Sequence, residues 1–386
     1  MNKRWMILPA LAAAGFAQTD SAIRRDGSQW AETTTGTVKA PARGRLRVES
    51  SGSVSVRGQA DGLVSYTLRK RVRAAGEAEA RRLFERAVLR VRTEDDLVTI
   101  TFVAPRERQM TAELELSVPR WLEQTRLQTN WGNVQAYDLD GTVEAETGAG
   151  VLRLDRIGKG AVARSGGGAV WVGTVNGPVR CVSGGGTVRI ERAGGETWVE
   201  SAGGEVRVRE VLGALHVATG GGSIWVQRAA AIVNARTAGG IIEVQEAGGS
   251  VTARTAGGGI EVGQARGVEC DAHSGAIRLR SVSGALKANT ASGSIFAEFA
   301  ASGLLDSILS TGSGDVTVFI PSNVAVTVRA QNESGSRAAR IVSDFPEIRA
   351  QAAALSMAVA EGAINGGGPV LRLSTANGTI FLRRQK

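Results

Sequence analysis

Glu243 and Glu261 are the residues of this chain whose type and spacing come closest to a catalytic pair. Paired carboxylates cleave most glycosidic bonds, and they stand about 5 Å apart when the mechanism retains configuration. Both glutamates occupy the same place in successive 18-residue blocks, so a stack of strands would set them on adjacent rungs. No second polar group converges on them, and Trp225 and Arg278 flank them as in an ordinary solvated ladder. We therefore assign no catalytic residue and keep a carbohydrate-active enzyme as an alternative.

Three tryptophans are the candidate binding residues, namely Trp171, Trp198 and Trp225. All three fall at positions expected to point away from a core, and exposed tryptophan is frequent at binding hot spots. Trp171 and Trp225 are three blocks apart, about 14 Å in a stack of strands, which suits stacking on sugar rings or contact with a protein partner. Trp198 falls on the other strand of its block and faces away from them. The alternative is that caps or loops cover these side chains.

His216 and His273, the only histidines, do not form a metal-binding or catalytic set. His216 falls beside Trp198 at an outward position and His273 falls in a turn, which favours solvent exposure over ligation. Calcium-binding β-rolls need an aspartate in each G-G-x-G-x-D-x-U-x turn, whereas the turns here hold Ala, Gly, Thr and Arg. We expect no metal and no cofactor.

The two cysteines, Cys181 and Cys270, fall at inward positions five blocks apart. Five strand spacings of about 4.8 Å separate them by about 24 Å, far beyond the ~7 Å limit for a disulfide. We therefore expect two buried free thiols.

A repeat positions all of these residues. A Thr or Ser recurs with a constant 18-residue period, in most cases before a Gly-rich turn, at Thr129, Thr147, Ser165, Ser183, Ser201, Thr219, Thr237 and Thr255. When this residue is counted as position 0, positions 5 and 7 are aliphatic in almost every block, and positions 14 and 16 repeat the pattern. Such alternation predicts two short strands per block.

A constant period favours winding over hairpins, because a coil lays each strand in register on its counterpart in the next coil. Burial of four aliphatic side chains contributes roughly 6–12 kcal/mol per block, whereas ordering its residues costs about 1–2 kcal/mol each. Single coils are therefore unstable and stacks are stable. We predict an all-β fold, a single-stranded β-helix-like solenoid of 18-residue coils. The period shortens by one residue between Ile260 and Ile277 and returns to 18 at Ile295.

An open stack leaves unpaired backbone groups at both ends, so we expect caps. Residues 18–126 should form an N-terminal capping region, a small α/β cap with one amphipathic helix over residues 75–88. The solenoid should span residues 127–320, and a C-terminal capping segment should span residues 321–386.

Two features are expected within the C-terminal capping segment. Residues 351–360 could form a short helix or an irregular cover. Residues 370–382 read as two strands joined at Asn377-Gly378, a turn signal that predicts a terminal β-hairpin.

The N-terminus has the pattern of a secretory signal peptide, with Asn2-Lys3-Arg4 followed by an apolar run and small residues. We expect cleavage after Ala17, so that residues 1–17 are removed and the mature chain reaches the periplasm, the cell surface or the medium. No later apolar stretch approaches the ~20 residues that span a bilayer. The formal net charge is +9, of which Lys3 and Arg4 contribute two. The remaining arginines are scattered beside glutamates, which disfavours a nucleic-acid partner.

Several segments carry a family resemblance. They are Val118-Pro119 before the first regular block, the Thr/Ser-Gly-Gly turns, and the tail segments Ser343-Asp344-Phe345-Pro346, Asn365-Gly366-Gly367-Gly368-Pro369 and Leu373-Ser374-Thr375-Ala376-Asn377-Gly378. Together they resemble the bacterial putative-adhesin family over most of the mature chain. The resemblance implies a β-solenoid-like fold, and because the family has no established catalytic residues, none is carried over.

The repeat, the export pattern and the lack of a catalytic set predict a non-enzymatic, exported, adhesin-like β-solenoid that binds or supports the cell envelope. Its partner would be a cell-surface glycan or an envelope protein. Two alternatives stay open: a polysaccharide lyase or hydrolase on one face of the solenoid, and a purely structural envelope protein.

Overall fold

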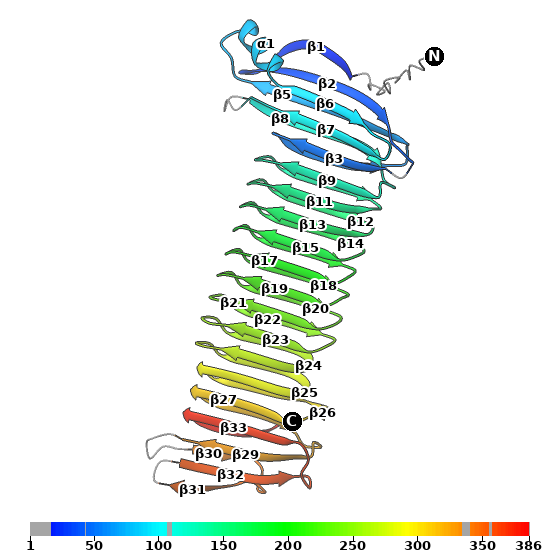
Figure 1. The fold of residues 1–386 in the computed structure, drawn as a ribbon. Helices are drawn as coiled ribbons and strands as arrows, with labels where there is room; N and C mark the ends of the chain where they lie inside the picture. The colour runs from blue at the N-terminus through cyan, green and yellow to red at the C-terminus, as the bar shows by residue number, and fades with distance from the viewer. Residues whose placement is uncertain (1–16, 43, 106–109, 334–339, 355–356, 386) are drawn as a thin grey trace, which may run out of the picture. The chain divides into compact units, whose positions relative to one another are not determined.

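The computed structural model describes residues 17–42, 44–105, 110–333, 340–354 and 357–385 (Figure 1). The predicted signal peptide, residues 1–17, lies outside these residues except for Ala17. The chain divides into two compact units, an N-terminal unit of residues 1–168 and a C-terminal unit of residues 169–386.

The described part of the N-terminal unit is built from strands and one short helix. In chain order these are β1 (Ala17–Asp26), β2 (Gln29–Lys39), β3 (Arg45–Ser50), β4 (Ser53–Gln59), β5 (Leu63–Val72), α1 (Glu77–Glu85), β6 (Val88–Thr93), β7 (Leu97–Val103), β8 (Met110–Pro119), β9 (Gln124–Thr129), β10 (Val134–Leu139), β11 (Thr142–Thr147), β12 (Leu152–Ile157) and β13 (Gly160–Ser165).

Two ladders of hydrogen-bonded strands organise this unit. One has the order β6–β7–β3–β9–β11–β13, and the other has the order β1–β2–β5–β8–β4–β10–β12. The pairings inside the stack of coils are parallel, whereas β6 with β7, and β1, β2, β5 and β8 among themselves, pair antiparallel. The antiparallel strands therefore cap one end of the stack.

The coil made by β3 and β4 is out of chain order in this stack. It pairs on one side with β7 and β8, and on the other side with β9 and β10. The first coil of the chain is thus held between two coils that come later in the sequence.

Helix α1 packs on the cap through a small apolar face. Ala80 and Phe84 are buried and cluster with Val72 of β5. The helix was expected over residues 75–88 and is shorter, because Val88 begins β6 and is exposed rather than packed on the helix face.

The described part of the C-terminal unit consists of strands. They are β14 (Val170–Val175), β15 (Val179–Ser183), β16 (Val188–Ala193), β17 (Thr197–Ser201), β18 (Val206–Val211), β19 (Leu215–Thr219), β20 (Ile224–Ala229), β21 (Val233–Thr237), β22 (Ile242–Ala247), β23 (Val251–Thr255), β24 (Ile260–Ala272), β25 (Ile277–Ser292), β26 (Ile295–Leu304), β27 (Ser307–Ser313), β28 (Val316–Pro321), β29 (Val326–Asn332), β30 (Arg340–Ser343), β31 (Arg349–Ala354), β32 (Met357–Ile364), β33 (Val370–Asn377) and β34 (Thr379–Gln385).

These strands also form two parallel ladders (Figure 1). The first-strand ladder contains β14, β16, β18, β20 and β22 and continues into β24. The second-strand ladder contains β15, β17, β19, β21 and β23 and continues into the later part of β24. Each pair is offset by one full repeat of the sequence, as in Val206 on Ile224 and Leu215 on Val233. The predicted solenoid of 18-residue coils is confirmed.

Aliphatic ladders form the core of the C-terminal unit. Positions 5, 7, 14 and 16 of one coil are Val206, Val208, Leu215 and Val217, and all four are buried. The period changes where the sequence predicts it, because Ile260 pairs with Ile277, and Ile277 pairs with Ile295.

The first strand of each coil buries a third row of residues that the alternation rule did not predict. Simple alternation would turn position 9 inward, but position 10 is the buried one, as at Val211. The pairing of β18 with its neighbours skips Arg209 at position 8, so two consecutive side chains, Arg209 and Glu210, face outward. A local irregularity of this kind bends a strand and re-aims its side chains.

The Ser or Thr at position 0 links several coils to the one before, at Thr147, Ser165, Thr219, Thr237 and Thr255. Thr219 Oγ1 donates to the carbonyl oxygen of Gly204 at 2.9 Å and accepts from the amide of Gly222 at 3.3 Å. The same two bonds recur one coil later at Thr237, with Gly222 and Gly240. These hydroxyls satisfy buried backbone groups at the turn, which explains the spacing of the Ser and Thr residues.

The C-terminal cap differs from the expectation. Within residues 351–360, expected as a short helix or irregular cover, the described residues 351–354 and 357–360 belong to β31 and β32, which pair antiparallel with each other, and β32 also pairs antiparallel with β29. Residues 355 and 356 lie outside the described residues. The predicted terminal hairpin is wrong. Both edges of β33 are occupied by parallel β27 and β29, and both edges of β34 by parallel β28 and β30. Asn377-Gly378 therefore forms a coil corner, and the last coil of the chain lies between two earlier ones.

Candidate functional site

Trp225 stands at position 6 of β20, on the outer face of the first-strand ladder. Its side chain is 38% exposed, and its direct ladder neighbours are Arg207 on β18 and Glu243 on β22. A groove of about 410 Å³ surrounds it, which we call the Trp225 groove. It is lined by Arg189, Ile190, Glu191, Arg207, Val208, Arg209, Trp225, Val226, Gln227, Glu243 and Gln245. Strands β16, β18, β20 and β22 supply all of these residues, so the backbone of the solenoid fixes their spacing.

Positive charge predominates in the Trp225 groove. Arg189 Nε lies 2.6 Å from Glu191 Oε1, and Arg209 lies 3.6 Å from the other oxygen of the same carboxylate. Arg207 pairs with Glu205, which is outside the groove. Exposed ion pairs of this kind contribute about 0–1 kcal/mol. An anionic ligand could therefore displace them with little loss.

The other two predicted tryptophans lie outside this groove. Trp171 has the same position on β14 and is half-buried, and the ladder runs from it through Arg189 and Arg207 to Trp225. Trp198 is 40% exposed on the second-strand ladder, where its ring stacks on His216 at 3.9 Å between centroids. The structure thus separates the three candidates and places only Trp225 in the groove.

Glu243 and Glu261 are direct neighbours on β22 and β24. Glu261 is paired with Arg280 at 2.7 Å, and Glu243 accepts a hydrogen bond from Gln245 at 3.4 Å. Only Glu243 lines the Trp225 groove.

The two histidines lie in separate places. His216 Nε2 is 3.3 Å from Glu196 Oε1, and its Nδ1 is 3.2 Å from the amide nitrogen of Asn234. His273 lies in the turn after β24. Within the described residues, no group of three or more His, Cys, Asp and Glu side chains is arranged to hold a metal ion.

Both cysteines are buried and free, as predicted. Burial in an apolar environment disfavours the thiolate, and it raises the pKa of Cys181 to about 12. The pKa of Cys270 is raised for the same reason, with a smaller contribution from Glu269 and Asp271. Burial therefore favours the protonated thiol at both positions.

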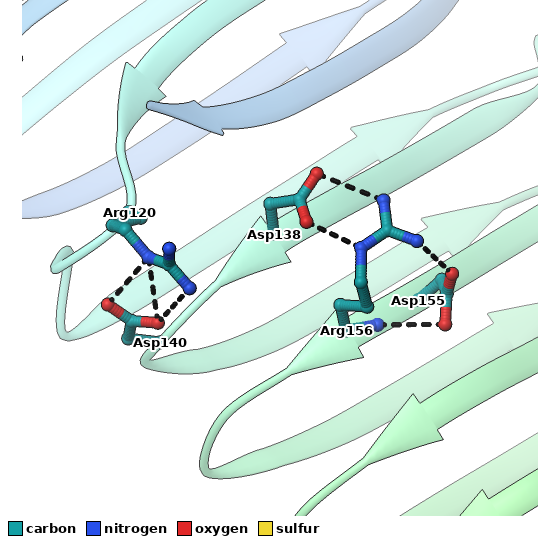
Figure 2. Close-up of polar contacts among 5 residues, drawn as sticks. All are labelled: Arg120, Asp138, Asp140, Asp155 and Arg156. Carbon is teal, nitrogen blue, oxygen red and sulfur yellow. Dashed lines mark hydrogen bonds and ion pairs between the residues drawn. The ribbon is translucent and has the colours of Figure 1, made fainter. Parts of the chain in front are cut away.

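A cluster of ion pairs lies on the outer face of the N-terminal unit (Figure 2). Arg156 donates to Asp138 from Nε at 2.5 Å and from a terminal nitrogen at 3.0 Å, and its other terminal nitrogen lies 2.5 Å from Asp155. Arg120 and Asp140 form a second pair at 3.0 Å. The hydrogen bond from Arg156 is the main reason why the pKa of Asp138 is lowered.

This cluster stabilises backbone geometry. Asp138 and Arg156 both have positive φ, 62° and 55°, and both occupy position 9 of their coils, where the strand is irregular. Such conformations are unfavourable for non-glycine residues. Because the guanidinium of Arg156 is engaged by two carboxylates, the arrangement holds the irregular strands in place.

The polar lining of the Trp225 groove was missed as a group by sequence reasoning. In the sequence, Arg189, Arg207 and Arg209 belong to the arginines scattered beside glutamates, and Gln227 and Gln245 have no motif that marks them. The available signal was the repeat itself, because positions 6 and 8 of neighbouring coils share one face with Trp225. Trp131, in the N-terminal unit, was also overlooked and is 77% exposed.

No helix in the described residues has the length and apolar character needed to cross a membrane.

Residues 198–382 match the family model described as Toastrack DUF4097. Two solved structures are similar. One is a "putative cell adhesion protein" from Clostridium sporogenes, with 8% identity over 92% of this chain and 100% of that chain and a TM-score of 0.21. The other is a "putative adhesin" from Parabacteroides distasonis, with 12% identity over 72% of this chain and 97% of that chain and a TM-score of 0.28. Among curated proteins, none matches the chain.

Proposed function

We propose that this protein is an exported, non-enzymatic β-solenoid whose Trp225 groove binds an acidic glycan of the cell envelope. The observation that carries the proposal is the exposed indole of Trp225, held among three arginines on a strand ladder. An exposed aromatic face offers a flat apolar surface to the C–H side of a sugar ring. Guanidinium groups pair with carboxylates in a planar, two-point geometry.

The neutral polar residues of the groove support a sugar ligand in particular. Gln227 and Gln245 lie on β20 and β22, at position 8 of successive coils, and their amides can donate to and accept from hydroxyl groups. All of these side chains rise from strands whose register the core fixes, so little backbone conformational entropy is lost when a ligand binds.

Export is proposed from the sequence over residues 1–17, with its basic start, apolar run and small residues. An exported chain would meet the sugar polymers of the envelope, whose acidic groups match the arginines of the groove.

The test is binding of the mature chain to immobilised polyuronate, with dextran as the neutral polymer, at low and moderate salt. Trp225→Ala should weaken polyuronate binding at least tenfold. Trp198→Ala is the matched control, because that tryptophan is equally exposed in the same unit but lies on the other ladder. It should bind as the parent does.

If both tryptophan variants lost polyuronate binding equally, or if Trp225→Ala bound as the parent does, the Trp225 groove would not be the binding site. Analysis of sugars released in the same samples tests the enzyme alternative. Release that disappears in Glu243→Gln would move the assignment to a carbohydrate-active enzyme, since that carboxylate lines the groove.

A further inference from the structure

A second groove, of about 530 Å³, lies on the C-terminal unit and shares no residue with the Trp225 groove. It follows the second-strand ladder over β21, β23, β24, β25 and β27. Its residues come from the end of each strand, around position 0, and from the turns that follow. Its lining residues are Arg236, Thr237, Arg254, Thr255, Ala256, Asp271, Ala272, His273, Asn289, Thr290, Ala291 and Ser310.

One continuous row of outward side chains forms the polar part of this groove. Successive strands pair Arg236 with Arg254, Arg254 with Asp271, Asp271 with Asn289, and Asn289 with Ser310. Parallel rungs are about 4.8 Å apart. The row therefore changes from two cations at one end to an anion and then to neutral hydrogen-bonding groups at the other.

The two arginines are only partly compensated. Like charges placed directly opposite each other destabilise a sheet, and the Arg236–Arg254 pair is of this kind. Arg254 lies 3.3 Å from Glu269, a carboxylate that also pairs with Lys287 at 3.6 Å. Arg236 has neither an ion pair nor a side-chain hydrogen bond with any residue that the structure describes. A ligand carrying two negative charges would relieve the repulsion.

The remaining groups of the row suit hydroxyl groups of a ligand. Asp271 is exposed and accepts hydrogen bonds only, whereas the amide of Asn289 both donates and accepts. Ser310, at the end of the row, is held by Ser374 at 2.8 Å. The carboxylate of Asp271, next to Arg254, would repel a second anionic group of the ligand. The ligand should therefore carry its negative charge at one end only.

We propose that this groove binds a phosphorylated polyol or sugar, with the phosphate at Arg236 and Arg254 and the hydroxyls along Asp271 and Asn289. A phosphate monoester carries close to two negative charges at neutral pH and three acceptor oxygens, which arginine binds well. The ligand is recognised by this chemistry whether it is free or a terminal unit of an envelope polymer.

The experiment uses the mature chain and three probes: glycerol 3-phosphate, inorganic phosphate and glycerol. Binding is followed through the imidazole NMR signals, which report location because the chain has only two histidines. His273 lines this groove, whereas His216 stacks on Trp198 elsewhere in the unit. Glycerol 3-phosphate should shift the His273 signals and leave those of His216 in place, phosphate should do so more weakly, and glycerol should have no effect.

Two variants separate the two ends of the groove. Arg236→Gln should weaken binding of both phosphate probes at least tenfold. Asp271→Ala should leave phosphate binding intact or stronger, because it removes a negative charge, but should abolish the preference for glycerol 3-phosphate, because it also removes the acceptor for the hydroxyl groups. Arg228→Gln is the control, since Arg228 is exposed in the same unit and paired with Glu246 outside the groove.

His273 signals that do not respond to any probe, or an Arg236→Gln variant that binds like the parent, would overturn the proposal. A phosphodiester-linked glycerol polymer with a terminal phosphate can be tested in the same way. If it binds as tightly as free glycerol 3-phosphate, the proposal extends to envelope polymers. Polyuronate binding at the Trp225 groove should be unaffected in Arg236→Gln, so failure of one proposal leaves the other testable.

Discussion

At the scale of single residues, the glycine at position 3 of each coil is required by its distance from the coil before it. A Cβ added to Gly222 would lie 2.2 Å from the carbonyl oxygen of Gly204, and one added to Gly240 would lie 2.1 Å from that of Gly222. The neighbouring Gly221 has nothing within 4 Å of such a Cβ. The two adjacent glycines therefore have different roles in the same turn.

We expect Gly222→Ala to destabilise the protein by about 1–3 kcal/mol, as overpacking of a rigid site does. Gly221→Ala should be neutral or stabilising by up to about 1 kcal/mol, because it reduces the entropy of the unfolded chain. Chemical denaturation of both variants checks this, and similar midpoints for the two would contradict the close stacking of the turns.

Asp138 gives a pH-dependent prediction. Its folded-state pKa is lowered by the hydrogen bond from Arg156, so its contribution to stability is complete above the unfolded-state value near 4 and is lost as the pH falls through the lower folded-state value. Asp138→Asn should therefore lower the melting temperature at pH 7, and the difference from the parent should narrow as the pH falls below about 4.

Thermal unfolding between pH 7 and pH 2.5 measures this difference. Asp61→Asn is the control, because Asp61 is exposed and forms no ion pair among the described residues. A gap between Asp138→Asn and the parent that stayed constant down to the lowest pH would exclude an ionised Asp138 as its cause.

At the scale of elements, the hydroxyl of the position 0 residue ties neighbouring coils together. Thr219→Val keeps the shape of the side chain but leaves the carbonyl of Gly204 and the amide of Gly222 without this partner. Loss of a hydrogen-bond partner for buried groups costs about 1–3 kcal/mol. Thr252→Val, on the outward face of β23, should change the stability by less than about 0.5 kcal/mol. Equal denaturation midpoints for the two variants would show that the hydroxyl ladder does not bind the coils together.

Sequence periodicity predicted the strands of the repeat because it has two local causes, the alternation of buried and outward residues and the Thr or Ser at each turn. Positions such as Val206 and Val208 alternate with outward residues, and each Thr or Ser marks a turn. The inward shift to Val211 could not be foreseen, since it depends on an irregular strand that alternation does not encode. Residues 351–360 are rich in alanine and lack alternation, so their pairing with β29 through β32 comes from tertiary contacts.

The candidate site was predicted only in part for a related reason. Periodicity places Trp225 outward, but it says nothing about which side chains leave space between them. The difference between Trp225, which lines a groove, and Trp198, which is covered on one face by His216, comes from the neighbouring rungs. Residues on neighbouring strands of the ladder around Trp225 are 18 positions apart in the sequence. The arginines beside Trp225 could therefore have been predicted from the sequence.

At the scale of the whole molecule, the chain places a coil out of order at each of its ends. In the N-terminal unit β3 and β4 lie between later strands, and in the C-terminal unit β33 and β34 lie between earlier ones. In a simple repeat array each terminal coil has one neighbour. Here the first and last coils each have two.

Removal of residues 370–386 should therefore destabilise the C-terminal unit much more than loss of one coil would. It separates β29 and β30 from β27 and β28, which β33 and β34 otherwise join. The control is a deletion of residues 220–237, one full repeat, which preserves the phase of the stack. Hydrogen exchange should show lost protection at β28 and β29 in the truncated chain, and near-normal protection there in the control.

The placement of the last coil also has a consequence for the order in which the protein can be made. A ribosome delivers β27 and β28 before residues 370–385, and one edge of each strand lacks its partner until that segment arrives, whereas the other edge already pairs with β25 or β26. Unpaired strand edges invite pairing with other chains. The nascent chain thus carries an open strand edge until residues 370–385 have been made, and a chain that ends before them would expose this edge to pairing with other chains.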